Sequence, residues 1–221
     1  IDSLISLFRE IDCFYIADGH HRSASAVKVG LKRRKEHPGY TGDEEFNFFM
    51  AVIFPDSDLK IYDYNRVVKD LNGLSDAEFL DRISERFLVE PVEKGPYRPE
   101  AKHTFGMYLS GRWYKLTAKP EIVCDEDVIQ CLDVSILQEN LLQPVLGIQD
   151  PRTDKRIDFV GGIRGLAELE RRVALDMAVA FALYPVSISE LLAVADKGMI
   201  MPPKSTWFEP KLGSGLFMHE L

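Results

Sequence analysis

The spacing of apolar and polar positions over the first 70 residues predicts both helices and strands. Apolar residues recur at helical intervals from Ile1 to Ile11, whereas the aromatic and apolar runs further on have the composition of buried strands. The stretch 20–37 has a helical pattern with a basic last turn, which suits the negative end of a helix dipole. The pattern predicts a helix over 1–11, a strand over 13–17, a helix over 20–37, and strands over 46–54 and 59–68.

Beyond residue 70, hairpin signals occur together with strand–helix pairs. Ser75 and Glu78 have the spacing of a capping box, and Ser187 is a second candidate N-cap residue. Ser110-Gly111 separates two strand-like runs, as a hairpin turn does. The pattern predicts helices over 74–87, 125–147, 165–175 and 187–198, strands over 103–109, 112–118, 157–162 and 177–186, and an extended or irregular tail over 199–221.

This mixture of hairpins and strand–helix–strand units indicates an α+β or mixed α/β protein. We place a soft boundary near residue 70, between an α/β part over 1–70 and a mixed α+β part with antiparallel hairpins over 71–221. The chain has 221 residues, of which 46% are hydrophobic. That composition argues against disorder and is sufficient for a substantial core.

Charge and cysteine content narrow the classes of function. The formal net charge of −8 disfavours direct DNA contact, although a few cations and backbone N–H groups would suffice for a local anion site. No run approaches the ~20 apolar residues of a membrane span, and no signal peptide is visible. Because no apolar run is long enough, we expect no membrane association. Because the three cysteines form no paired framework, we expect a cytoplasmic protein. Because the chain opens at Ile1 inside a helical pattern, we expect an upstream segment to be absent.

The first candidate site is the run Asp18-Gly19-His20-His21-Arg22, which lies where a predicted strand passes into a predicted helix. Free backbone N–H groups and the positive end of the helix dipole make such a junction a natural anion site. Gly19 allows close approach of the backbone to a ligand, and Arg22 can hold a phosphate in a bidentate grip. Cations at a helix N-terminus oppose the dipole unless an anion compensates them.

Three roles remain open for Asp18: helix N-cap, Mg²⁺ ligand or general base. His20 and His21 can donate hydrogen bonds or transfer protons near neutral pH. Adjacent histidines project about 100° apart on a helix, which disfavours a shared zinc ion. The structural alternative is an N-cap followed by a solvated first turn.

A second candidate lies in the tail, where Lys204, Ser205 and Thr206 precede Trp207 and Phe208. A rigid loop with a cation, two hydroxyls and two aromatic rings could serve a phosphate and a flat base. The alternative is a proline-stiffened loop that caps the core. A third polar group, Asp133-Val134-Ser135, is more typical of a polar helix face. No dinucleotide fingerprint or P-loop is present, and nothing indicates zinc, haem or NAD.

Three segments in order along the chain resemble domain-of-unknown-function family 1015, a set of uncharacterised bacterial and archaeal proteins. They are "YIADGHHR", "LDVSILQENLLQPVLGI" and "MPPKSTWFEPKLGSGL". Members of that family are typically longer at the N-terminus. The resemblance therefore agrees with the expectation that an upstream segment is absent.

The Asp-Gly-x-His-Arg element also resembles the ParB/sulfiredoxin superfamily, whose members bind nucleotide or phosphate at the same strand-to-helix junction. One branch, the free serine kinases, transfers phosphate from a nucleotide to serine. By position, Asp18, His21 and Arg22 match its phosphate-handling motif, with Gly19 as the turn. The acidic catalytic residue that those kinases take from an earlier strand has no counterpart here. The resemblance implies an incomplete ParB/sulfiredoxin-like α/β part, and it covers about the first third of the chain.

Together these features favour a nucleotide- or phosphate-binding protein, most simply a phosphotransferase or phosphohydrolase for a small hydroxylated metabolite such as serine or phosphoserine. The alternative is a non-catalytic nucleotide-binding switch of ParB-like type. Asp18 and His21 are the candidate catalytic residues, and Asp18 is also the candidate Mg²⁺ ligand. The expected nucleotide is ATP, ADP or CTP, and the oligomeric state stays open. The candidate phosphate- or nucleotide-binding residues are Gly19, His20, Arg22, Ser23, Lys204, Ser205 and Thr206.

Overall fold

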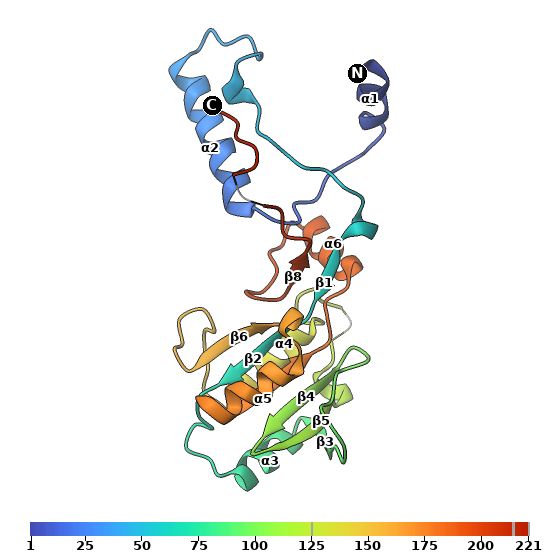
Figure 1. Cartoon of the computed structure of the whole chain (residues 1–221), viewed down its shortest axis with the longest axis vertical. Coiled ribbons are helices and arrows are strands. Elements are labelled where there is room, and N and C mark those ends of the chain that lie inside the picture. Colours follow the sequence, from blue (N-terminus) through green and yellow to red (C-terminus); the bar gives the residue numbers. More distant parts are fainter. Residues whose placement is uncertain (125, 214, 221) are drawn as a thin grey trace. The chain divides into compact units, whose positions relative to one another are not determined.

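The structure is a computed structural model that describes residues 1–124, 126–213 and 215–220. It separates into two compact units (Figure 1). The first unit combines Ile1–Lys60 with Pro210–Leu221, and the second comprises Ile61–Glu209. Each unit is described by itself below.

The second unit is built on a six-stranded sheet in which all neighbouring strands are antiparallel. The strand pair β4–β5 is the predicted hairpin, and Ser110 and Gly111 at its turn have φ angles of 47° and 81°. Positive φ at both central residues is the type of turn that follows the strand twist. In spatial order the strands are β3 (Phe87–Pro91), β5 (Arg112–Ala118), β4 (Thr104–Leu109), β7 (Val179–Leu183), β2 (Tyr64–Val68) and β6 (Ile157–Gly161).

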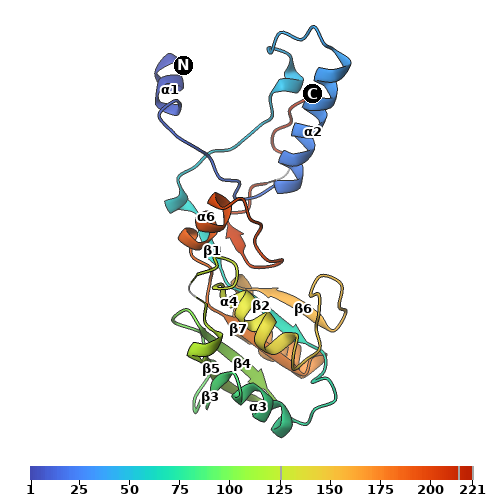
Figure 2. The same ribbon diagram turned by 180° about the vertical axis from the view of Figure 1, so that it is seen from behind.

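Helices cover both faces of this sheet. Helix α5 (Leu166–Leu175) lies over one face in Figure 1, where Leu169 packs with Val67 and Ala180 in the smaller apolar cluster. Helices α3 (Asp76–Ser84) and α4 (Asp133–Leu137) lie over the other face in Figure 2, in the larger cluster. Alternation of side chains along each strand supplies both layers, which explains the continuous apolar character of β7.

The capping signals of the sequence are confirmed. Ser75 accepts a hydrogen bond from Glu78 N, and Glu78 Oε2 accepts one from Ser75 N at 2.8 Å. Ser187 and Glu190 repeat this arrangement at the start of α6 (Ile188–Asp196). The strands predicted over 157–162 and 177–186 and the helix over 165–175 also form as expected.

The long helix predicted over 125–147 is only partly correct, and its residue 125 lies outside the described residues. The helical stretch comprises α4 and a π-helical turn over Gln138–Leu142. Before it, Asp127 Oδ1 accepts hydrogen bonds from the backbone of Ile129 at 2.7 Å and Gln130 at 3.0 Å. Such side-chain bonds offer the backbone an alternative to helix, so 126–132 forms turns.

The strand predicted over 59–68 is divided at Asp63. Its first part, β1 (Lys60–Tyr62), pairs with β8 (Trp207–Glu209) in a separate two-stranded sheet, and its second part is β2. The sequence pattern predicted only an extended or irregular tail over 199–221, and β8 is its extended part. The chain therefore combines helices with antiparallel sheet, and the predicted α+β fold class is confirmed.

The first unit contains helices α1 (Asp2–Phe8) and α2 (His20–Glu36), as the sequence predicts. The buried strands predicted over 13–17 and 46–54 are not found: 13–17 forms no strand, and 46–54 holds only the end of a 3₁₀ turn over Glu45–Asn47. Phe14, Phe49 and Val52 are about half exposed, at 55%, 51% and 58%. β-prone composition forms a strand only when a neighbouring strand accepts its backbone hydrogen bonds, and within the described residues no strand pairs with these segments.

Short 3₁₀ turns connect the other elements. The 3₁₀ turns span Asp56–Asp58, Pro120–Ile122 and Gly162–Arg164. Across the parts of the chain that the structure describes, the helices are all too short or too polar to cross a lipid bilayer.

Candidate functional site

The turn that leads into α2 depends on Gly19. Gly19 is the N-cap residue of the helix, with φ of 80° and ψ of 27°, a left-handed conformation that residues with a side chain rarely adopt. A Cβ atom built on Gly19 would lie 3.0 Å from Nη2 of Arg22. The left-handed backbone conformation therefore favours glycine at this position, whereas the exposed guanidinium of Arg22 would only have to shift to admit a Cβ atom.

Two cations flank the carboxylate of Asp18. Arg22 Nη2 lies 3.6 Å from Asp18 Oδ2, and Lys211 Nζ lies 3.9 Å from Asp18 Oδ1. All three side chains are exposed or partly exposed, so these ion pairs contribute little to stability. Asp18 does not serve as the N-cap, because the helix has no side-chain cap hydrogen bond. Of the three roles that the sequence left open for Asp18, the N-cap role is therefore not found.

The first turn of α2 presents backbone donors beside these cations. The first helical hydrogen bond runs from Ser23 N to Gly19 O at 2.9 Å, so the N–H groups of His20, His21 and Arg22 have no carbonyl partner inside the helix. His20 and His21 are exposed and Ser23 is half-buried. The first turn contains no acidic residue. Most helix starts carry acidic residues, whereas this one carries the cations Arg22 and Lys211. An anionic ligand would balance their charge.

The candidate tail residues and the turn at Asp18 belong to different units. Lys204, Ser205 and Thr206 belong to the second unit, whereas Asp18–Arg22 belongs to the first. Lys204 has a φ of 57°, and its Nζ lies 5.7 Å from the ring centroid of Tyr64, within cation–π range. The hydroxyl of Ser205 is buried and donates to the carbonyl of Pro202 at 2.6 Å, which holds the loop in shape.

An aromatic group surrounds Tyr64 in the second unit. Its ring lies 5.6 Å from Trp207 and 6.0 Å from Phe159. The guanidinium of Arg66 lies 5.5 Å from the centroid of Phe159 and donates to the carbonyl of Tyr64. Burial lowers the pKa of Arg66 to about 10, which leaves the group charged at neutral pH. Trp207 packs directly on Gly161, where a Cβ would lie 2.6 Å from its ring.

Two residues of interest were not among the sequence candidates. Lys211 belongs to the same tail segment as Lys204, but only Lys211 contacts Asp18 in the described structure. Its position at the end of "KSTWFEPK" gave no reason to prefer it. Arg66 sits in an apolar strand pattern, and a buried arginine has no signature in such a pattern.

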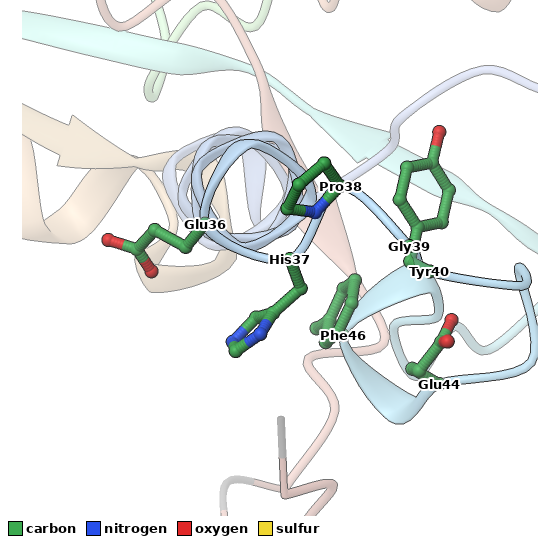
Figure 3. A pocket seen from close by; sticks show the side chains of 7 residues that line it. All are labelled: Glu36, His37, Pro38, Gly39, Tyr40, Glu44 and Phe46. Atoms are coloured by element: carbon green, nitrogen blue, oxygen red, sulfur yellow. The ribbon is translucent and has the colours of Figure 1, made fainter.

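A cavity of about 500 Å³ lies at the other end of α2 (Figure 3). Its walls come from the end of the helix and the loop that follows, where His37 stacks on Phe46 at 6.2 Å. Seventeen helical residues span about 25 Å, so this cavity is separate from the turn at Asp18. The lining residues are Glu36, His37, Pro38, Gly39, Tyr40, Glu44 and Phe46.

A Mg²⁺ ion at this turn would need ligands from outside the protein. Residues 1–124, 126–213 and 215–220 contain no group of three or more His, Cys, Asp or Glu side chains that could hold a metal. Asp18 is one carboxylate, and Arg22 and Lys211 already offset its charge. Mg²⁺ commonly binds through one or two carboxylates together with waters and substrate phosphates. Asp18 therefore suits Mg²⁺ only when a phosphate is bound as well.

Comparisons with known proteins give one family and several solved structures. The family model described as "Protein of unknown function (DUF1015)" matches residues 1–135, more than half of the chain. A free serine kinase in complex with AMP has 18% identity and a TM-score of 0.44 over 90% of this chain and 68% of that chain. A mutant free serine kinase in complex with ADP has 20% identity and a TM-score of 0.43 over the same shares. A conserved hypothetical protein from Pyrococcus furiosus has 19% identity and a TM-score of 0.43 over 87% of this chain and 68% of that chain. No curated protein matches the sequence.

Proposed function

This chain belongs to the family described as protein of unknown function DUF1015, and we propose that it binds the phosphates of a nucleotide at the start of α2. We further propose that it is a phosphotransferase or phosphohydrolase for a small hydroxylated metabolite such as serine or phosphoserine. The observation that carries this proposal is the cationic turn itself. Arg22 and Lys211 flank Asp18 beside N–H groups that lack helical partners.

Each residue of the turn has a distinct part in this proposal. Arg22 and Lys211 hold phosphate oxygens, and the N–H groups of the first turn add neutral donors. Asp18 positions Mg²⁺ or the attacking hydroxyl, and His21 exchanges a proton with the reacting group. Electrostatic stabilisation and positioning are the main contributions that a protein makes to phosphoryl transfer. The resemblance of this turn to the ParB/sulfiredoxin phosphate motif supports the same assignment.

The tail residues Lys204, Ser205 and Thr206 remain proposed nucleotide ligands. The nearby rings of Tyr64 and Trp207 support a role for this loop beside a flat base. Against it stands the hydroxyl of Ser205, which is already engaged with Pro202. Lys204→Ala tests the loop without disturbing that bond: the proposal expects weaker nucleotide binding than wild type.

Calorimetry of the wild-type chain with ATP, ADP, CTP and inorganic phosphate tests the binding step. We expect measurable heat with at least one nucleotide, and an affinity that falls as salt rises, since the ligand is held by exposed cations. Absence of heat with all four ligands would overturn the proposal.

The Asp18→Ala variant tests the chemistry. Removing the carboxylate frees Arg22 and Lys211 for phosphate, so nucleotide should bind at least as tightly while phosphate transfer or hydrolysis is lost. Asp12→Ala makes the same change of charge at an exposed carboxylate of the same unit and should keep both properties. Nucleotide binding without turnover in wild type would instead favour the non-catalytic switch.

A further inference from the structure

The cavity at the C-terminal end of α2 combines aromatic rings with negative charge (Figure 3). Its volume of about 500 Å³ falls within the range of ligand pockets in proteins. Its aromatic side chains are His37, Tyr40 and Phe46, and its acidic side chains are Glu36 and Glu44. Among the described residues that line it there is no lysine or arginine. The lining therefore favours a positively charged ligand over an anion.

The carboxylate of Glu44 is held in place by four neutral donors. Its Oε1 accepts hydrogen bonds from the backbone N–H of Thr41 at 2.8 Å and from the hydroxyl of Thr41 at 3.1 Å. Its Oε2 accepts from the backbone N–H of Gly42 at 3.0 Å and from the side-chain amide of Asn47 at 2.9 Å. The hydrogen bond from Thr41 N is the main cause that lowers the pKa of Glu44 from 4.5 to about 2, so this carboxylate is ionised at neutral pH.

These hydrogen bonds use the acceptor positions of Glu44 but leave its charge. A carboxylate has about four lone-pair sites, and each of them has a donor here. Within the part of the chain that the structure describes, Glu44 forms no ion pair. Arg34 Nε donates instead to Oδ1 of Asn47 at 2.6 Å, so the amide of Asn47 lies between the guanidinium and the carboxylate. A ligand group that matches Glu44 is positively charged and needs no hydrogen-bond acceptor.

The aromatic rings suit the same kind of group. A cation is attracted to the face of an aromatic ring within about 6 Å of its centroid, and quaternary ammonium groups are bound in this way. The ring of Tyr40 already attracts one cation, because Cζ of Arg34 lies 5.4 Å from its centroid. Arg34 engages one face of this ring, which leaves the other face for a ligand. The ring of Phe46 is stacked on His37 at 6.2 Å, which fixes its orientation.

We propose that this cavity binds a small soluble quaternary ammonium compound, whose cationic group lies beside Glu44 and against the rings of Tyr40 and Phe46. A primary ammonium group has three N–H donors, for which Glu44 offers no free acceptor position. Glu36 contributes less charge, because Lys32 Nζ lies 3.7 Å from its Oε1. The cavity and the turn at Asp18 lie at opposite ends of α2, so this binding is independent of the proposed nucleotide site.

Calorimetry of the whole chain with four probes, at matched ionic strength, tests the ligand class. Tetramethylammonium has the cationic group alone, choline adds a hydroxyethyl arm, and ethanolamine has that arm on a primary ammonium. The fourth probe is the neutral alcohol in which carbon replaces the nitrogen of choline. We expect heat with both quaternary probes, at least about threefold weaker binding of ethanolamine, and no binding of the neutral alcohol. Absence of heat with both quaternary probes, or affinity for ethanolamine or the neutral alcohol equal to that for choline, would overturn the proposal.

Two variants at Tyr40 separate the aromatic ring from its hydroxyl. Tyr40→Leu removes the ring and should weaken choline binding by about threefold or more. Tyr40→Phe keeps the ring and should bind choline as wild type does. Undiminished affinity in folded Tyr40→Leu would show that the ligand does not lie against this ring and would contradict the assignment.

A second pair of variants tests the charge of Glu44. Glu44→Gln removes it, whereas Asp43→Asn makes the same change at an exposed neighbour outside the cavity lining. Choline affinity should fall by about threefold or more in Glu44→Gln and stay near wild type in Asp43→Asn. Equal affinities in the two folded variants would contradict the role of Glu44. Because an amide nitrogen cannot accept the hydrogen bonds of this loop, the Tyr40 pair decides the proposal if Glu44→Gln does not fold.

Discussion

At the scale of single residues, the carboxyl of Asp133 should dominate the pH dependence of stability. Burial, reinforced by the charge of Glu190, raises its pKa from 3.8 to about 7, although His103 N and Lys102 act in the opposite direction. The folded chain thus holds a proton between pH 4 and 7 that the unfolded chain releases. Stability from this group is complete below the unfolded pKa and is lost as pH rises through 7, by on the order of 4 kcal/mol.

Asp133→Asn should remove this dependence. The amide oxygen can still accept from His103 N, and no buried charge forms at high pH. Urea unfolding between pH 5 and 8.5 should show a flatter profile than wild type and a greater relative stability at pH 8. Asp81→Asn, at an exposed position of α3, should retain the wild-type slope. Parallel profiles for Asp133→Asn and wild type would contradict the raised pKa.

Gly19 gives a second prediction at this scale. Gly19→Ala forces a side chain into a φ of 80° and brings its Cβ within 3.0 Å of Arg22 Nη2, so Arg22 must move. The conformational cost alone is about 1–2 kcal/mol. We expect weaker nucleotide binding by calorimetry. Gly42→Ala also has a positive φ, of 109°, with no atom within 4 Å of the added methyl group, and should bind nucleotide as wild type does.

At the scale of elements, the capping boxes allow a direct stability measurement. Ser75→Ala removes the hydroxyl that accepts from Glu78 N and should lower the free energy of unfolding by about 1 kcal/mol. Ser84→Ala, at the other end of α3, removes only a hydrogen bond to the carbonyl of Asp81. It should change the free energy of unfolding by only about 0.3 kcal/mol. Equal effects of the two substitutions in urea unfolding would contradict the capping role of Ser75.

The elements also show what sequence can and cannot predict. Capping boxes, the Ser110-Gly111 hairpin and the start of a helix after Gly19 depend on neighbours within a few residues, and their patterns predicted them correctly. The runs 13–17 and 46–54 have strand composition, but pairing depends on distant segments, which composition does not describe. Which tail lysine meets Asp18 likewise depends on the path of the chain from Lys204 to Lys211.

At the scale of the whole molecule, the two units differ in how much apolar surface they bury. Among the described residues of the first unit only Gly30 is buried, whereas the second unit contains both apolar clusters. Apolar burial is the main source of stability, so the first unit should open far more readily than the second.

Hydrogen exchange tests this contrast. Amides of β4 and β7 should exchange only through global unfolding, while those of 13–17 and 48–54 should exchange with little protection. Strong protection of 13–17 and 48–54 would contradict the described first unit and would show that these segments pair with other strands in solution.

The central claim is that the start of α2 binds phosphate through Arg22 and Lys211. Calorimetric titration of ADP into wild type, Arg22→Ala and Lys211→Ala tests it most directly, with Arg9→Ala as the matched loss of an exposed positive charge in the first unit. A charged hydrogen bond contributes about 1.5–3 kcal/mol, so each of the two site variants should bind ADP at least about tenfold more weakly, with Arg9→Ala unchanged. Wild-type affinity in both site variants would contradict the claim.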